Sequence, residues 1–119
     1  MEPTTEKEFD DKGNLIKECR KLDGKLHGLT TIWYENRSKL AEIEFNHGKR
    51  HGISKEWYEN GHMKMKAESK NGEYEGEYTT WWPNGKKKEE GIYKGGKRVG
   101  KYTWYKENGE ILQEHDYQG

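Results

Sequence analysis

The chain repeats itself every 24 residues, and this period constrains its fold more than any other feature. Four interleaved sets of positions recur at that interval. They are Gly24, Gly48, Gly72 and Gly96; Gly28, Gly52, Gly76 and Gly100; Gly13, Arg37, Gly61, Gly85 and Gly109; and the aromatic set Phe9, Trp33, Trp57, Trp81 and Tyr105. Such a pattern indicates one supersecondary unit used about five times.

Each unit contains two turn signals, which alternate at spacings of 11 and 13 residues. The first series is Asn60–Gly61, Asn84–Gly85 and Asn108–Gly109, with Lys12–Gly13 and Asn36–Arg37 as weaker members. We expect two-residue type I′ turns there, because asparagine and glycine accept the positive φ angles that such turns require. The second series is Asp23–Gly24, His47–Gly48, Asn71–Gly72 and Gly95–Gly96.

Between the turns, aromatic residues and threonines alternate with period two, which is typical of strands. No segment shows a helical period, so no second layer is expected to cover the sheet. The sequence therefore predicts an all-β fold, an elongated single-layer antiparallel meander of about ten strands in five tandem hairpins. We place a tail or first edge strand at 1–8 and one repeat domain at 9–119, with units at 9–24, 25–48, 49–72, 73–96 and 97–119.

The turn positions also predict the strand register. Counting across Asn60–Gly61 pairs Tyr58 with Met63, Glu56 with Met65 and Ser54 with Ala67. The same count pairs Tyr34 with Lys39, and it pairs the aromatic set as Trp33 with Leu40, Trp57 with Lys64, Trp81 with Lys88, and Tyr105 with Leu112.

The second glycine set has a predicted purpose in this register. Gly28 falls opposite Phe45, Gly76 opposite Tyr93 and Gly100 opposite Tyr117, and only Gly52, opposite Ser69, lacks a ring. We expect each glycine to make room for the ring across from it, because an aromatic ring can cover the bare backbone of a strand glycine.

The composition suits a thin sheet better than a packed globule. Apolar residues make up 29% and charged residues 37%, yet the chain has five Trp and eight Tyr, which argues against disorder. Lysine plus arginine equals aspartate plus glutamate, 22 each, so net charge favours no partner and argues against nucleic acid. The single Cys19 excludes an internal disulfide, and we expect a cytoplasmic location because no signal peptide or membrane span is evident.

The unit from Tyr58 to Gly76, with its Tyr-Glu-Asn-Gly start, resembles the MORN repeat, and more specifically the bacterial MORN-variant repeat of the YwqK-like antitoxin family. The resemblance extends from Phe9 to Gly119 and departs from the pattern at Arg37, at Ser69 and at the early Trp104–Tyr105 pair. It implies a β-hairpin repeat sheet. It also implies an antitoxin or immunity protein that binds a cognate toxin, or, as in eukaryotic relatives, a membrane-surface or scaffold protein.

Catalysis and metal binding have little support in the sequence. There is no nucleophile elbow or phosphate-binding loop, and the carboxylates recur with the repeat, as solvated strand positions do. His27, His47 and His51 could approach one another, but exposed turn and strand positions explain them better. We therefore expect no enzyme activity, no cofactor and no metal.

Aromatic residues are the best candidates for a binding site, because Trp and Tyr are enriched at interface hot spots and a single-layer sheet cannot hide both faces. The first choice is Trp33, Trp57, Trp81 and Tyr105, and the second is Tyr34, Tyr58 and Trp82 on the opposite face. A basic segment at 86–101, including Lys88, Lys97 and Arg98, could attract an acidic partner or an anionic membrane surface, or could simply keep the sheet soluble. The exposed terminal strands could also pair between chains.

Overall fold

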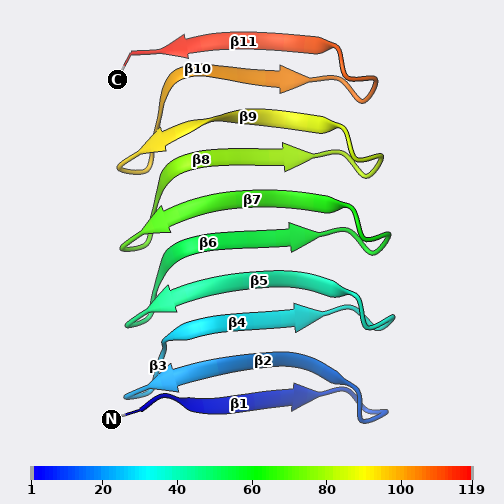
Figure 1. Cartoon of the computed structure of the whole chain (residues 1–119), viewed down its shortest axis with the longest axis vertical. Helices are drawn as coiled ribbons and strands as arrows, with labels where there is room; N and C mark the ends of the chain where they lie inside the picture. The colour runs from blue at the N-terminus through cyan, green and yellow to red at the C-terminus, as the bar shows by residue number, and fades with distance from the viewer. Residues whose placement is uncertain (1, 119) are drawn as a thin grey trace.

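A computed structural model describes residues 2–118 and shows one open antiparallel sheet. The strands are β1 (Thr4–Phe9), β2 (Leu15–Leu22), β3 (Lys25–Leu26), β4 (Gly28–Trp33), β5 (Lys39–Asn46), β6 (Lys49–Trp57), β7 (Met63–Lys70), β8 (Glu73–Trp81), β9 (Lys87–Lys94), β10 (Lys97–Tyr105) and β11 (Ile111–Tyr117). Except for the short β3, which pairs with β2, they lie in chain order from one end of the sheet to the other (Figure 1). The predicted meander of hairpins is confirmed.

The molecule is one layer thick, with extents of 44 × 32 × 14 Å. Residues 2–118 contain no helix, so the described chain has none that could cross a membrane. The turns line two opposite edges of the sheet (Figure 1). Eleven strands are found instead of about ten because His27 separates β3 from β4, where the backbone N–H of His27 bonds to the carbonyl of Arg20.

The two turn series have different geometries, and the type I′ prediction is wrong for the Asn–Gly series. Gly61 has φ 90°, but Asn60 does not have positive φ. The Gly61 N–H donates to the Tyr58 carbonyl, and the Tyr58 N–H donates to the His62 carbonyl. This is a three-residue loop, a type I turn closed by a left-handed residue. Arg37 keeps the left-handed angle at the equivalent position, with φ 71°.

The second series forms the type I′ turns. Both central residues of each pair have positive φ, for example 52° and 77° at Asp23–Gly24 and 48° and 86° at His47–Gly48. These turns are also stacked on one another, because the N–H of Gly48, Gly72 and Gly96 bonds to a carbonyl of the preceding hairpin. The side of the sheet that carries the type I′ turns is thus stabilised by hydrogen bonds between successive units.

The three-residue loops introduce a bulge that shifts the predicted register near each loop. Glu56 pairs with Met65 and Ser54 with Ala67, as predicted, but Met63 faces Trp57 and not Tyr58. Lys39 likewise faces Trp33 and not Tyr34. The predicted partners of the aromatic set are therefore wrong by one residue: Trp33 faces Lys39, Trp57 faces Met63, Trp81 faces Lys87, and Tyr105 faces Ile111.

The second glycine set pairs as predicted, but the predicted reason is wrong. Gly28 faces Phe45, Gly52 faces Ser69, Gly76 faces Tyr93 and Gly100 faces Tyr117. A Cβ at Gly28 would lie nearest to Arg20, and one at Gly76 nearest to Glu68, not to the facing ring. These glycines are needed because φ is 102° at Gly28 and 105° at Gly52, which L side chains rarely adopt.

Much of the core is a row of side chains that crosses the sheet on one face. Ala41 and Met65 are buried beside this row, and Thr31 and Thr103 are buried on the opposite face. From β2 to β11 the row is Cys19, Thr30, Ile43, Ser54, Ala67, Tyr78, Gly91, Tyr102 and His115. Small and large members alternate from Ala67 to Tyr102, and Tyr102 is fully buried because its ring lies over Gly91. An aromatic ring therefore does cover a strand glycine, but at the pair Gly91 and Tyr102, which the 24-residue period did not indicate.

Candidate binding surface

The sheet has two faces with different roles. We call the face that carries the core row the ladder face, and the opposite face the tryptophan face, because Trp33, Trp57, Trp81 and Tyr105 lie on it. These four side chains are half-buried. In residues 2–118 none of the four rings takes part in a close contact between aromatic rings.

Exposed aliphatic side chains accompany the tryptophans on the same face. Leu29 and Ile53 alternate with Trp33 and Trp57 along β4 and β6, so each pair shares a face. Ile92 joins them because it faces Glu77, which alternates with Trp81 along β8. Their exposed fractions are 42%, 37% and 42%, respectively, so the tryptophan face keeps apolar surface in contact with solvent.

The second-choice rings lie on the ladder face and connect adjacent hairpins. The Tyr34 hydroxyl donates to the Trp57 carbonyl, and the Tyr58 hydroxyl to the Trp81 carbonyl, each at 2.7 Å. The Trp82 Nε1–H donates to the Tyr105 carbonyl at 3.3 Å. In the pairs Trp33–Tyr34, Trp57–Tyr58 and Trp81–Trp82, the first ring therefore lies on the tryptophan face, and the second ring bonds to the next hairpin.

Asparagine side chains form a parallel set of contacts along the three-residue loops. The Oδ1 atoms of Asn36, Asn60, Asn84 and Asn108 each accept from the backbone N–H two residues later, as Asn60 does from His62. The Nδ2 groups of Asn36, Asn60 and Asn84 donate to carbonyls of the next loop, those of Glu59, Pro83 and Glu107. Asparagine suits this position because its side-chain amide can accept a hydrogen bond within its own loop and donate one to the next loop.

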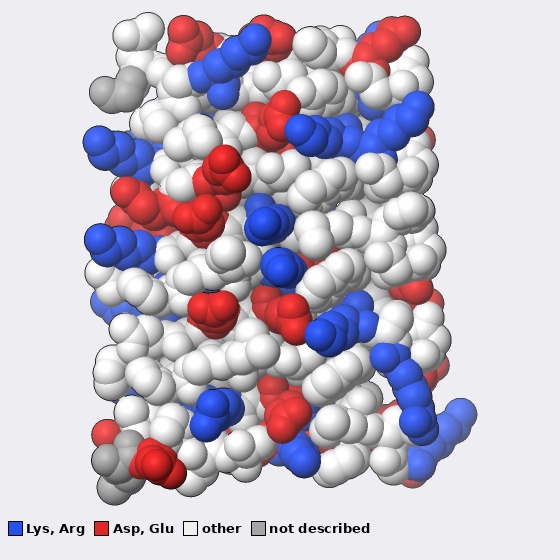
Figure 2. Space-filling view, in the orientation of Figure 1, with Lys and Arg blue, Asp and Glu red and all other residues white. Residues whose placement is uncertain are grey.

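The structure separates Lys88 from the other two basic candidates, Lys97 and Arg98. Lys88 lies near the loop end of β9, and its Nζ is 4.8 Å from the centre of the Trp82 ring. Arg98 faces Tyr93 at the opposite end of β9, and Lys97 adjoins the type I′ turn. Lysines, arginines and carboxylates are also interspersed over the face shown in Figure 2. The basic segment of the sequence therefore does not form one basic patch.

Arg98 belongs to an aromatic cluster on the ladder face that the sequence analysis missed. Its guanidinium carbon is 4.5 Å from the ring centre of Tyr102, and its nitrogens donate to the hydroxyls of Tyr93 and Tyr117 at 3.2 Å. Tyr74, Tyr78 and Tyr93 form a triangle with centroid separations of 5.2 Å. These hydrogen bonds raise the pKa of Arg98, and burial raises the pKa of Tyr78 to about 12, so the cluster keeps its cation and its neutral phenols.

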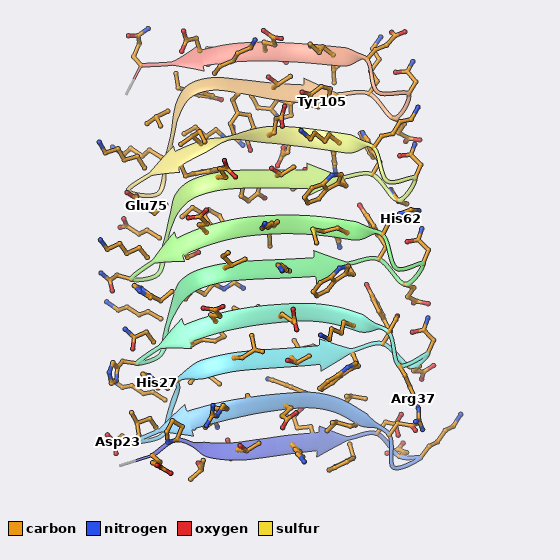
Figure 3. All side chains as sticks on the ribbon, viewed as in Figure 1. Asp23, His27, Arg37, His62, Glu75 and Tyr105 are labelled. Atoms are coloured by element: carbon orange, nitrogen blue, oxygen red, sulfur yellow. The ribbon has the colours of Figure 1, made fainter. Side chains whose placement is uncertain are left out.

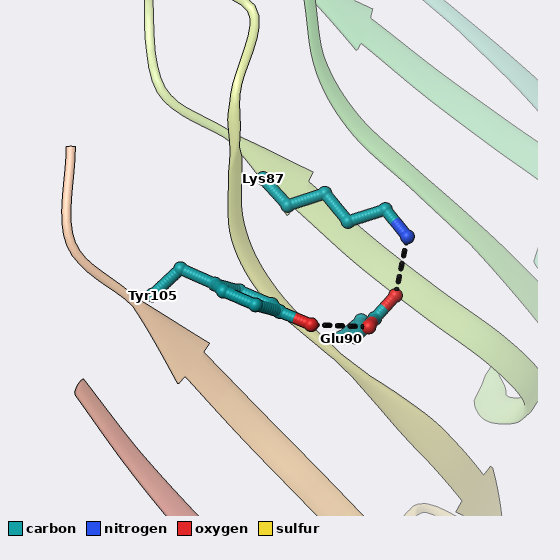
Figure 4. A network of polar contacts seen from close by, with 3 residues as sticks. All are labelled: Lys87, Glu90 and Tyr105. Atoms are coloured by element: carbon teal, nitrogen blue, oxygen red, sulfur yellow. Dashed lines mark hydrogen bonds and ion pairs between the residues drawn. The ribbon is translucent and has the colours of Figure 1, made fainter. Parts of the chain in front are cut away.

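A polar network lies on the tryptophan face between β9 and β10 (Figure 4). The Tyr105 hydroxyl donates to Glu90 Oε1 at 2.6 Å, and Lys87 Nζ is 2.7 Å from Glu90 Oε2. Lys87 and Tyr105 together lower the pKa of Glu90, and the bond to Glu90 raises the pKa of Tyr105 to about 12. The network borders an open groove of about 520 Å³, whose lining also includes Thr79, Thr103 and Ile111.

His27 and His51 bond to the backbone at the side of the sheet formed by the type I′ turns. His27 Nδ1 accepts from the His47 N–H at 3.1 Å, and His51 Nδ1 accepts from the Asn71 N–H at 3.4 Å. Glu75 has the same role toward Gly95 one unit later. Figure 3 shows His27 and Glu75 at this edge, with Arg37 and His62 at the other. No group of three metal-ligating side chains occurs in the described part of the chain.

Comparison with known proteins agrees with the hairpin units. A family model described as MORN repeat variant matches residues 50–71, 74–94 and 98–118, which together make up more than half of the chain. The three matches coincide with the hairpins β6–β7, β8–β9 and β10–β11. Neither the curated proteins nor the solved structures gave a match.

Proposed function

Because the chain belongs to the MORN repeat variant family, whose repeats are non-catalytic and commonly serve as binding modules, we propose that it is an antitoxin or immunity protein. It binds a cognate bacterial toxin, in the cytoplasm, and neutralises it by covering an essential surface. This assignment depends on the resemblance of the repeat units to the antitoxin family.

The docking surface that we propose is the tryptophan face. The observation that supports it is that only one ring of each of three aromatic pairs bonds to a neighbouring hairpin. Tyr34, Tyr58 and Trp82 are engaged in bonds between hairpins, whereas the rings of Trp33, Trp57 and Trp81 have no aromatic partner within residues 2–118. Large rigid rings beside exposed aliphatic side chains are the usual composition of an interface centre.

The experiment begins with the gene next to the one that encodes this chain. The neighbouring protein is expressed with and without this chain, and growth and co-purification are measured. We expect the neighbour to inhibit growth alone, and the wild-type chain to restore growth and to bind it. Alanine at Trp57 and Trp81 should weaken binding by at least about tenfold each, because buried interface tryptophans commonly contribute more than 1 kcal/mol.

A matched control lies on the ladder face. Lys64→Ala removes an exposed side chain whose Nζ lies 5.6 Å from the Tyr58 ring centre, and it should leave binding unchanged. Loss of binding with Lys64→Ala but not with the tryptophan variants would assign the partner to the other face. Salt-sensitive flotation with anionic vesicles, without any protein partner, would replace the antitoxin proposal with the membrane-surface alternative.

A further inference from the structure

We propose that copies of this chain associate head to tail, with β11 of one copy pairing with β1 of the next. Within residues 2–118, β1 pairs only with β2 and β11 only with β10. Each of these strands therefore presents unpaired backbone N–H and C=O groups along its outer side. This inference is independent of the proposed function.

The repeat defines the register in which the two edges would meet. Between two internal units, Lys66 of β7 faces Thr79 of β8, and Ala67 faces Tyr78. Two periods further along the chain, the equivalents of Lys66 and Ala67 are Glu114 and His115. Three periods back, the equivalents of Thr79 and Tyr78 are Lys7 and Glu6. A copy added in repeat register thus places Lys7 opposite Glu114, and Glu6 opposite His115.

The charges at these positions are complementary. Lys7 faces Glu18 in its own copy, so the added contact would place it between two carboxylates. Glu114 lies 3.3 Å from Lys101 in an exposed ion pair, and Glu6 lies 2.8 Å from Lys21. By contrast, two β11 strands paired antiparallel about their midpoint, Glu114, would bring like charges together.

Exposed apolar side chains also lie on the two terminal strands, β1 and β11. Phe9 on β1 is 57% exposed, and Ile111 and Leu112 on β11 are 53% and 62% exposed, more than the other exposed large apolar side chains of residues 2–118. Phe9 has the repeat position of Trp33, and Ile111 that of Leu15. Leu15 and Trp33 already line one hollow of the sheet. In the head-to-tail contact, Ile111 and Phe9 of the next copy would form the same arrangement.

Such a contact joins two different surfaces and does not close on itself, so it produces chains of increasing length. The test is sedimentation velocity over a wide range of protein concentration. We expect the average mass of the wild-type chain to rise with concentration beyond that of a dimer. Lys7→Glu and Glu114→Lys should each require about tenfold higher concentration for the same average mass, because each places like charges across the contact.

Mixing the two variants is the decisive measurement. When a Lys7→Glu copy alternates with a Glu114→Lys copy, opposite charges again face each other at every contact. The equimolar mixture should therefore regain the association of the wild type. Lys66→Glu is the matched control, since it reverses an exposed charge in the middle of the sheet and should leave association unchanged. Ile111→Ser with Leu112→Ser should weaken association without any change of charge.

Circular dichroism of each variant checks that the sheet is retained, and Lys7→Gln replaces Lys7→Glu if repulsion from Glu18 unfolds β1. A wild-type chain that remains monomeric at all concentrations would overturn the proposal. So would a mixture that associates no better than its components. A closed dimer that is insensitive to both charge reversals would also overturn it.

Discussion

The hydroxyl of Tyr58 donates a hydrogen bond to the backbone carbonyl of Trp81, which lies 2.7 Å away in the next hairpin. Tyr34 bonds to Trp57 in the same way, 24 residues earlier for both partners. The period of the sequence is therefore also the period of the contacts that join the units. Because these contacts connect nearest neighbours only, each should add its own increment to the stability of the whole array.

Tyr58→Phe should lower the free energy of unfolding by about 1 kcal/mol, because it removes one hydrogen bond and leaves the Trp81 carbonyl without that donor. Urea unfolding followed by tryptophan fluorescence measures the change. Tyr74→Phe is the matched control, since the Tyr74 hydroxyl makes no hydrogen bond within residues 2–118. Equal effects of the two substitutions would show that the bond between hairpins contributes nothing.

The Glu90–Tyr105 contact should make stability depend on pH at both extremes. The lowered pKa of Glu90 gives a contribution that is complete above the ordinary carboxyl value of 4.5 and is lost as pH falls through the folded-state pKa. The pKa of Tyr105, raised to about 12, gives a contribution that is complete below pH 10 and is lost as pH rises toward about 12. Glu90→Gln should therefore cost about 0.5–1 kcal/mol at pH 7, since the pair is partly screened by solvent, and less at pH 3.

A double-mutant cycle identifies the partner. Glu90→Gln, Tyr105→Phe and the double variant are unfolded in urea at pH 7 and at pH 3. A coupling energy that shrinks from pH 7 to pH 3 is expected, because the pH then falls toward the lowered pKa of Glu90 and a protonated carboxyl lacks the charge that the Tyr105 hydroxyl stabilises. A coupling energy that stays constant between the two pH values would contradict this account.

The fold could be predicted from the sequence because the turns are encoded locally. A glycine at φ near 90°, as at Gly61, is a requirement of a single position, and it recurs wherever the unit recurs. The bulge beside Trp57 could not be predicted in the same way. Asn–Gly fits a type I′ turn and also a three-residue loop, and the choice between them changes which residue of the opposite strand faces Trp57.

The residues of the candidate surface could be predicted only where they recur with the 24-residue period of the sequence. The aromatic pairs at Trp57–Tyr58 and Trp81–Trp82 stand in one column, so the sequence indicated that their two rings lie on opposite faces. The cluster around Tyr102 and Arg98 does not recur as a whole with the period. In the preceding unit Tyr78 has the position of Tyr102, but Tyr74 replaces Arg98, and Ser54 and Thr30 replace the tyrosine in the units before it. Its contacts depend on side-chain reach across three strands, which spacing in the sequence does not define.

Arg37 should carry a measurable backbone strain. It has φ 71° at the position where the other units have glycine, and its Nη2 donates to Asn14 Oδ1 at 2.8 Å. Arg37→Gly should be more stable than Arg37→Ala by about 1 kcal/mol, because both lose the bond but only alanine keeps the left-handed penalty. Thermal unfolding of the two variants measures the difference, and an alanine variant as stable as the glycine variant would argue against strain.

Gly91 should be the least replaceable glycine in the sheet, although it lies outside all the periodic sets. A Cβ at this position would overlap Cδ2 of Tyr102, a ring that is fully buried and cannot move aside. Gly91→Ala should therefore destabilise the protein by about 2–3 kcal/mol in urea unfolding, as expected for overpacking of a core position. In the background of Tyr102→Ser, which sets a serine beside this position as Ser54 lies beside Ile43 two periods earlier, the same substitution should cost less than about 0.5 kcal/mol. A cost that persists in this background would show that Gly91 is required for its backbone, and not for the space that the Tyr102 ring occupies.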